Sequence, residues 1–422
     1  MQKSFVVDIR VARKVWRSLV GGHQVEKVLI FSSREICYSS GNFFAHQLAA
    51  AFEELGFLAE ICEIAPDDDL DAALAPLLSG TYRLAVDFNS MLPRMELEDG
   101  SRYLDRLRAP FFDYILDHPL FHYTGLTSGA RNLHALVLDE AQEAYVREYY
   151  PGVADVHTLP LGATRALYDG ERDAECRILF PGTYDDPESV YAVVEASDEP
   201  LRRRMKRLIE RRICKPLVPM EQAFREELAA EGTELEREQF ALLMNGMYAV
   251  DAYVRDYFRK KALDTLLAEN IPVTVMGTGW EKYGEKIGQN LRRERSVPFG
   301  LSFERIAKAQ ILLNVSPIFN RGMHDRIVAG MANGAVVLTD GNPYLEKYFA
   351  NGREMCFYSL TDDRELTGQA ELLLADRDLR EQIAERAYRE FAAHHTWRCR
   401  AEQILAWADE CAGMGSERKL HS

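Results

Sequence analysis

The sequence predicts an α/β protein with two parallel-sheet domains that face a cleft, together with a helical insertion. Short apolar runs typical of buried parallel strands occur in two series, one before about residue 175 and one that resumes near residue 272. Charged helical sequence without strand signals separates the two series. At 422 residues the chain is also too long for one ordinary core. Together these observations predict two Rossmann-like domains.

The first domain is predicted to span residues 1–175. Its first strand, residues 28–31, is followed by a loop of small residues, a helix with one apolar face and a second strand at 57–64. This order of elements is a βαβ unit. Three further strands and a closing segment are predicted at 84–88, 111–116, 135–138 and 157–162.

The second half of the chain repeats the α/β pattern after an interruption. A strand at 177–183 precedes a helical insertion or bridging segment, residues 187–262. The second Rossmann-like domain is predicted at 263–395, and residues 396–422 are expected to form a C-terminal helix that packs back toward the first domain. The strands expected in the second domain lie at 272–277, 311–315, 335–339 and 355–358. Ligands of such sheets normally bind in the cleft, outside the carboxyl ends of the strands.

Composition excludes several classes of function. Acidic residues outnumber basic ones, 66 to 51, and the resulting net charge of −15 repels phosphate backbones, so nucleic acid is not an expected partner. The seven cysteines form no C-x-x-C pair, and the ten histidines show no ligand spacing, so no metal site is predicted. No segment approaches the roughly 18 apolar residues of a spanning helix, and no signal peptide is evident, which predicts a cytoplasmic protein.

The segment from residue 314 to 344 carries the clearest site pattern. A buried strand leads into a loop that contains Asn320, Arg321 and Gly322, and a helix begins near residues 324–326. After the next strand, Asn342 is a good N-cap and Pro343 fits the first helical position.

Two strand-to-helix turns therefore leave backbone N–H groups at the carboxyl edge of one sheet, which favours binding of a pyrophosphate. Arg321 and Arg326 could add charge-assisted hydrogen bonds, and His324 could donate to a phosphate or to a sugar hydroxyl. The alternative interpretation is that Asp325 and Arg326 only pair with each other at the helix start.

A glycine turn, Gly277-Thr278-Gly279, follows another strand of the second domain and precedes Trp280. It lacks the third glycine of a dinucleotide fingerprint, so binding of NAD is not expected. A tight turn without any ligand contact is the alternative interpretation of both glycines.

In the first domain, Asp117 and His118 follow a strand end and are predicted to face the cleft. Either side chain could act as general base toward an acceptor hydroxyl. The alternative is a capped strand end in which Pro119 enforces the turn. Gly41 and Asn42 follow the first strand, where they could let the acceptor approach the backbone or simply form a turn.

One basic cluster, residues 201–215, has apolar residues at helical spacing beneath it. Peripheral contact with an anionic membrane or an acidic acceptor is one interpretation. A solvated helix face is the other, and we favour it.

Several of these motifs resemble CgeB-like glycosyltransferases, which are glycosyltransferase family 1-type proteins of the GT-B fold. Residues 322–326, 330–340 and 344–345 are similar to the donor-site segment of that family, and His395-Thr396-Trp397 with Arg400 is similar to its closing motif. Weaker similarity covers residues 277–280, 117–119 and 159–162.

The resemblance implies a nucleotide-diphosphate sugar bound to the second domain, with a UDP-sugar favoured, and an acceptor presented by the first domain. It implies no cofactor and no divalent metal. The residues it assigns to the donor are Gly277, Gly279, Trp280, Asn320, Arg321, Gly322, His324, Asp325, Arg326, Gly341, Asn342 and Tyr344.

The function expected from this resemblance is transfer of a hexose to a cell-envelope, spore-surface or protein acceptor in a bacterial cell. One departure from the family is notable. Many retaining GT-B enzymes carry a glutamate on the helix after the donor loop, whereas residues 326–329 contain no acid, so the stereochemical course stays open. The alternatives are a GT-B-fold nucleotide-sugar epimerase and a non-catalytic protein that binds sugar nucleotides.

Overall fold

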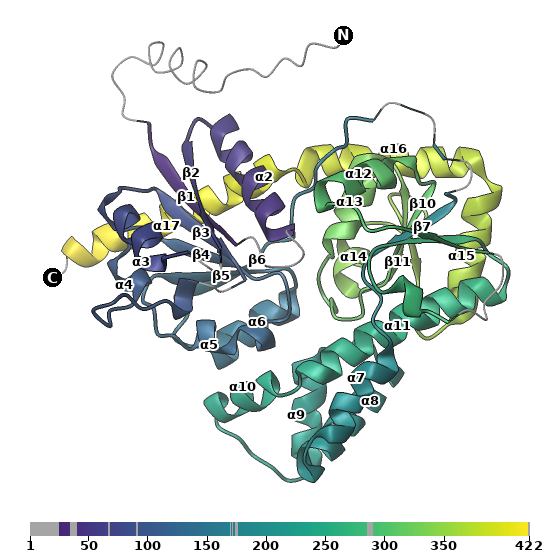
Figure 1. Ribbon diagram of the computed structural model, residues 1–422, viewed down its shortest axis with the longest axis horizontal. Helices are drawn as coiled ribbons and strands as arrows, with labels where there is room; N and C mark the ends of the chain where they lie inside the picture. Colours follow the sequence, from purple (N-terminus) through teal and green to yellow (C-terminus); the bar gives the residue numbers. More distant parts are fainter. Residues whose placement is uncertain are drawn as a thin grey trace.

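The computed structural model describes residues 25–33, 40–65, 68–89, 92–168, 170, 172–173, 176–284 and 290–420, with side chains up to residue 411. The first 24 residues of the predicted first domain, and residues 38 and 39 of its predicted small-residue loop, lie outside these ranges. Two α/β domains stand side by side, and a group of helices projects below them (Figure 1).

The first domain contains a six-stranded parallel sheet in the order β2-β1-β3-β4-β5-β6. Apolar residues fill its central strands, and those of β3, β4 and β5 are buried throughout. The strands are β1 (Lys27–Ser33), β2 (Leu58–Ile64), β3 (Leu84–Phe88), β4 (Phe111–Tyr114), β5 (Leu133–Val137) and β6 (Asp155–Thr158). The helices are α2 (Ser40–Glu54), α3 (Leu70–Leu74), α4 (Tyr103–Arg106), α5 (Tyr123–Leu126) and α6 (Glu140–Tyr149), with 3-10 turns η2 (Ala75–Ser79), η3 (Leu92–Arg94) and η4 (Pro119–His122).

The second domain has a parallel sheet in the order β12-β11-β10-β7-β8-β9. Its strands are β7 (Ile178–Pro181), β8 (Val273–Met276), β9 (Leu291–Glu294), β10 (Ile311–Asn314), β11 (Val336–Asp340) and β12 (Cys356–Tyr358). The chain proceeds outward from β7 to β9 and then returns to β10 on the other side of β7. This is the Rossmann order, and its topological switch point lies between β7 and β10.

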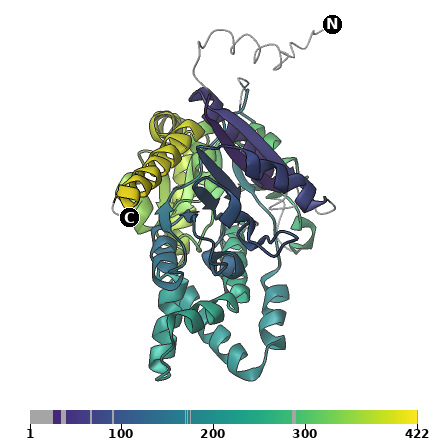
Figure 2. The same cartoon turned by 90° about the vertical axis from the view of Figure 1, so that its left-hand side faces the viewer.

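The helical segment is inserted inside the second domain, between β7 and β8. It consists of α7 (Pro187–Ala196), α8 (Glu199–Cys214), α9 (Met220–Ala230) and α10 (Arg237–Asn245), which project away from both sheets (Figures 1 and 2). The next helix, α11 (Tyr248–Ala268), leads directly into β8 and is the crossover helix of the sheet. The predicted domain start at residue 263 therefore leaves out β7 and most of α11.

The remaining helices cover the second sheet and return to the first domain. They are η5 (Trp280–Lys282), α12 (Phe299–Lys308), α13 (Asp325–Asn333), α14 (Pro343–Tyr348), α15 (Asp363–Ala375), α16 (Arg377–His394) and α17 (Trp397–Leu420). Helix α17 packs against α2, and Trp397 and Ile404 are buried in the core of the first domain (Figure 1). No helix in the described ranges combines the length and apolar character needed to cross a bilayer.

Candidate functional site

The carboxyl edge of the second sheet opens between β7 and β10, at the switch point. β7 continues into the turn Gly182-Thr183-Tyr184, and β10 continues into the loop that ends at α13. Because the two connections leave β7 and β10 in opposite directions across the sheet, the region outside these strand ends is where ligands of doubly wound sheets normally bind.

Arg326, in the first turn of α13, lies at this switch point. Its Nη1 donates to the side-chain oxygen of Asn314 at 2.7 Å, and its guanidinium lies 5.7 Å from the ring centre of Phe180 on β7. The side chain is buried, and burial lowers the pKa of Arg326. Its hydrogen-bond partner Asn314 is neutral, while the carboxylates of Asp325 and Asp340 offset part of its positive charge.

Two arginines of α11, Arg255 and Arg259, join Arg326 at this edge. Burial, followed by the like charges of Arg255 and Arg326, lowers the pKa of Arg259 to about 9. The Nε atom of Arg259 is buried and has no hydrogen-bond partner among the described residues. Asp256 offsets part of the charge, with its Oδ1 3.3 Å from Arg255 Nε and 4.0 Å from Arg259 Nη1. Burial opposes the charge of Arg255, but Asp256 and Asp251 outweigh it and raise the pKa of Arg255. Arg255, Arg259 and Arg326 are called the arginine cluster, in which a bound anion would relieve the repulsion between Arg259 and its two neighbours.

The glycine turn after β8 supports the turn after β7. A Cβ atom on Gly277 would lie 2.1 Å from the Gly182 oxygen, and one on Gly279, whose φ is +81°, would lie 2.0 Å from the Tyr184 oxygen. Trp280 is buried, and its indole N–H donates to the Gly182 oxygen at 2.7 Å. These contacts explain the two glycines and Trp280 by packing, and the contact of the three residues with the donor stays a prediction.

The loop Asn320-Arg321-Gly322 contacts the first domain and the insertion. The Asn320 amide donates to the oxygens of Pro216 and Pro317, and the Arg321 backbone N–H donates to the Asp139 carboxylate at 2.7 Å. A Cβ atom on Gly322 would lie 2.3 Å from the Leu138 oxygen. The loop therefore makes interdomain contacts, and the donor role of these residues stays a prediction.

The second predicted phosphate turn is also occupied by protein contacts. Asn342 caps α14, as expected from its sequence, and its amide donates to the oxygens of Phe319 and Gly322. The backbone N–H of Gly341 donates to the Tyr358 oxygen. Tyr344 is half-buried, and burial raises its pKa. These contacts leave Asn342 and Gly341 little capacity to bind a diphosphate.

His324 and Asp325 interact with each other at the start of α13. His324 Nδ1 lies 2.6 Å from the Asp325 carboxylate and 3.1 Å from the backbone nitrogen of Arg326. Burial opposes ionisation of Asp325, but His324 and Arg326 outweigh it and lower the pKa to about 2. The pairing of Asp325 with the Arg326 side chain, considered from the sequence, is replaced by this contact with His324.

Asp117 lies at the carboxyl edge of the first sheet and faces α11. Its Oδ2 accepts a hydrogen bond from the Asn89 amide at 3.3 Å, and Asn89 also accepts the Leu116 N–H at 2.8 Å. Asn89 is in the left-handed region, with φ +62°, a conformation that non-glycine residues rarely adopt outside turns and functional sites. Burial raises the pKa of Asp117, although the Arg255 charge acts in the opposite direction. A carboxyl group with a raised pKa is suited to proton transfer near neutral pH.

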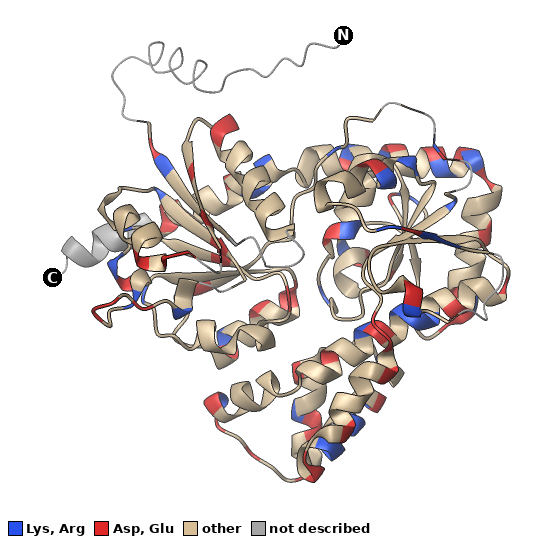
Figure 3. Cartoon of the chain, in the orientation of Figure 1, with Lys and Arg blue, Asp and Glu red and all other residues tan. Residues whose placement is uncertain are grey.

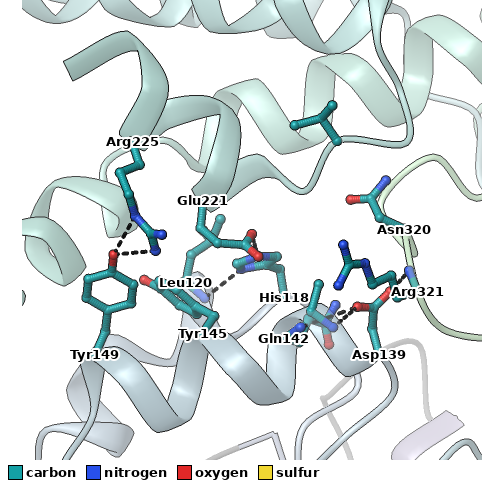
Figure 4. A network of polar contacts seen from close by, with 12 residues as sticks. His118, Leu120, Asp139, Gln142, Tyr145, Tyr149, Glu221, Arg225, Asn320 and Arg321 are labelled. Carbon is teal, nitrogen blue, oxygen red and sulfur yellow. Dashed lines mark hydrogen bonds and ion pairs between the residues drawn. The ribbon is translucent and has the colours of Figure 1, made fainter. Parts of the chain in front are cut away.

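His118 is buried between the first domain and the insertion (Figure 4). Its Nδ1 accepts the Leu120 N–H at 3.0 Å, so its proton resides on Nε2, which faces the Glu221 carboxylate at 3.5 Å. Because both ring nitrogens are engaged, His118 is a weaker candidate for the general base than Asp117.

Gly41 and Asn42 lie in the first turn of α2 rather than in a loop before the helix. The neighbouring Phe43 stacks on Phe303 and contacts Phe299, both in α12, so this turn adjoins the second domain. The assignment of Gly41 and Asn42 to the acceptor side stays a prediction.

Acidic residues lie among and beside the basic residues of α8 within the insertion (Figure 3). Arg204 and Arg207 pair with Glu231, Arg203 with Glu199, and Lys206 with Glu195. Arg212 is buried and donates to the oxygens of Pro216, Val218 and Pro317. This pairing favours a solvated helix face over contact with a membrane, since it leaves little uncompensated charge to attract an anionic surface.

Two sets of residues were missed by the sequence reasoning. Arg255 and Arg259 were included in the insertion, although their spacing of four residues places them on one helix face. Glu221 contacts His118 across 103 positions of sequence, which no local pattern reveals.

Comparison with known proteins agrees with the fold. Residues 255–406 match the model of a family described as glycosyl transferase-like, a range that begins at Arg255 and includes Arg259 and Arg326. A search of curated protein sequences gives no match. The resemblance to glycosyltransferases is thereby confirmed over most of the second domain.

Two solved structures have the same two-domain architecture over nearly the whole chain. Sucrose-phosphate synthase from Thermosynechococcus elongatus is 12% identical, with a TM-score of 0.55 over 92% of this chain and 100% of its own. An alpha-glucosyltransferase in complex with UDP-glucose and DNA containing an abasic site is 13% identical, with a TM-score of 0.52 over 91% of this chain and 100% of its own. The predicted GT-B fold is confirmed.

Proposed function

We propose that this protein is a glycosyltransferase whose nucleotide-diphosphate sugar binds at the switch point of the second sheet, with its diphosphate on the arginine cluster. The observation that carries the proposal is Arg259, whose Nε atom is buried without a hydrogen-bond partner among the described residues and whose charge is flanked by Arg255 and Arg326. Asp256 offsets part of this crowding of like charges, and a bound anion would offset more of it. The family match over this part of the chain supports a sugar nucleotide as that anion.

The cluster also supports metal-independent transfer. As the bond between the sugar and the diphosphate breaks, negative charge grows on the leaving phosphate oxygen. Positioned guanidinium groups stabilise such charge in the way that a divalent cation does in other enzymes. We expect turnover to survive EDTA, and loss of activity that Mg²⁺ restores would contradict this expectation.

Asp117 is the best candidate for the general base if the reaction inverts configuration. Its carboxylate would take the proton of the acceptor hydroxyl while that oxygen attacks the anomeric carbon and the nucleoside diphosphate leaves. Its position supports this role, because it faces α11 from the opposite side of the cleft and interacts with the charge of Arg255. The acceptor itself is expected to be a glycan, a cell-envelope or spore-surface component, or a protein.

The test is calorimetric titration of UDP and UDP-glucose into the wild type, Arg326→Ala and Arg203→Ala. Arg203 is the matched control, since it is exposed on α8 and pairs only with Glu199 among the described residues. Loss of a charged hydrogen bond should weaken binding by about 1.5–3 kcal/mol in Arg326→Ala and leave the control unchanged. Equal affinities in all three proteins would remove the donor from the switch point. Product analysis then separates transfer from epimerisation, and the absence of turnover with every acceptor would indicate a binding protein.

A further inference from the structure

The insertion reaches the loops that follow β4 and β10, one in each domain, and so adjoins both sides of the cleft. Helix α9 contributes Glu221 to His118, and α10 contributes Asn245, whose amide donates to the Leu120 oxygen at 2.7 Å. On the other side, Asn320 and Arg212 tie the insertion to the loop that follows β10. Figure 4 shows the resulting polar network between the domains.

The contacts around His118 fix the segment that includes Asp117. His118 and Glu221 are both buried, with side chains 4% and 10% exposed. The imidazole accepts from Leu120 with one nitrogen and faces Glu221 with the other, and its ring lies 5.4 Å from that of Tyr145. Leu116, on the other side of Asp117, is held by Asn89. Asp117 therefore lies between two anchored neighbours.

A second set of contacts keeps α9 against the first domain. Arg225, one turn after Glu221, donates to the Tyr149 hydroxyl at 2.6 Å and pairs with Glu148 at 3.0 Å. The Tyr149 ring stacks on Phe240 of α10 at 4.4 Å. These contacts fix the helix that carries Glu221. A side chain can orient a second side chain only if its own position is fixed in this way.

We propose that Glu221 of the inserted helix α9 is a positioning residue: it accepts a hydrogen bond from His118 Nε2 and thereby holds the 116–120 segment, so that Asp117 points toward the donor. The proposal rests on the proposed function for the role of Asp117, but the contact itself can be tested without turnover. Arg225 and Tyr149 serve the same purpose indirectly, because they hold α9 on the first domain.

The experiment compares Glu221→Gln, Glu221→Ala and Tyr149→Phe with the wild-type chain. Glutamine keeps an oxygen that can accept from Nε2–H, alanine removes it, and phenylalanine removes only the hydroxyl that Arg225 contacts. Glu226→Ala is the matched control, because Glu226 is an exposed acid on α9 whose partner Arg211 keeps Glu227. Three quantities are measured: hydrogen exchange of peptides covering 116–122, affinity for UDP, and release of UDP from UDP-glucose.

In Glu221→Ala we expect faster exchange in 116–122, unchanged UDP affinity and a loss of turnover of about 10- to 100-fold, as for partners that orient metal-binding side chains. Glu221→Gln should restore both exchange and turnover to near the wild-type level, and Tyr149→Phe should show a smaller effect of the same kind. Unchanged exchange in Glu221→Ala would overturn the proposal, as would a glutamine variant as impaired as the alanine variant. Parallel loss of UDP affinity and turnover would also overturn it, because it would indicate general damage to the fold.

The outcomes also separate this proposal from the proposed function. Absence of UDP binding in the wild-type chain would contradict the donor site, whereas the exchange of 116–122 would still report whether Glu221 holds this segment.

Discussion

Replacing Arg259 with methionine removes the middle charge of the arginine cluster and keeps most of the alkyl length. Burial and the charges of Arg255 and Arg326 lower the pKa of Arg259 from 12.5 to about 9. At 1.36 kcal/mol per pH unit, this difference means that the charged Arg259 side chain destabilises the folded protein by at most about 5 kcal/mol. Solvent near the side chain reduces this destabilisation. We therefore expect the free energy of unfolding at pH 7 to rise by about 1–3 kcal/mol, in the range seen when buried ions are replaced by apolar side chains.

Binding should change in the opposite direction. Loss of a charged hydrogen bond to a phosphate costs about 1.5–3 kcal/mol, which is a roughly 10- to 150-fold increase in the Kd of UDP. A residue that destabilises the fold and strengthens ligand binding is one retained for function rather than for packing. The combination of higher stability and weaker binding is therefore a sharper test than either change alone.

The assay combines urea denaturation with calorimetric titration of UDP, each performed on the wild type, Arg259→Met and Arg203→Met. The control removes an exposed arginine with a 57% exposed side chain, so both quantities should stay at the wild-type value. A less than twofold change in Kd for Arg259→Met would refute the placement of the diphosphate. A fall in stability would show that Asp256 needs Arg259, and that the cluster is a structural ion-pair network.

Three further predictions concern other parts of the molecule. Asp117→Asn should lower turnover by about 10²–10⁴ and leave the Kd of UDP unchanged if Asp117 is the base; near wild-type kcat would exclude it. Burial raises the pKa of Asp340 to about 6, so the protonated carboxyl stabilises the folded protein fully below about pH 4, and this contribution is lost as pH rises through 6. In Asp340→Asn, denaturant titrations should therefore show a free energy of unfolding that changes less between these two pH values. Gly322→Ala should cost about 1–3 kcal/mol because its Cβ meets the first-domain backbone, whereas Gly368→Ala, with open space around it in α15, should be neutral or stabilising; equal unfolding free energies would contradict the close domain contact.

Local patterns predicted five of the six strands of the second sheet and its helix caps, whereas the partly exposed strand β9 was missed. Asn342 caps α14 with Pro343 in its first turn, and Gly334 ends α13 in the left-handed conformation. Arg326 was placed near the correct strand end for the same reason. The position of its side chain was not predictable, because it depends on Asn314 and on Phe180 of β7, which is far away in sequence.

Arg255 and Arg259 were missed because the helix that contains them, α11, was assigned to the insertion. Two neighbouring parallel strands such as β7 and β8 are joined by a crossover connection, which is usually a helix. The helix that directly precedes β8 is therefore expected to be this crossover helix. Treating residues 187–262 as one insertion concealed that α11 belongs to the sheet. The crossover rule places Arg255 and Arg259 in the middle of the helix that leads into β8.

The loop from Asn314 to Arg326 contacts both the switch point of the second sheet and the first domain, so the position of Arg326 depends on the contact between the domains. Its two ends, Asn314 and Arg326, lie at the switch point, whereas its middle, residues 320–322, contacts the first domain and the insertion. A change that shifts the middle of the loop must therefore move either the domain contact or Arg326. If the donor binds at the switch point, we therefore expect substitutions at residues 320–322 to alter donor affinity through the position of Arg326. The position of Arg326 relative to Asp117 depends on the same contacts, because Asp139 of the first domain accepts from the Arg321 backbone.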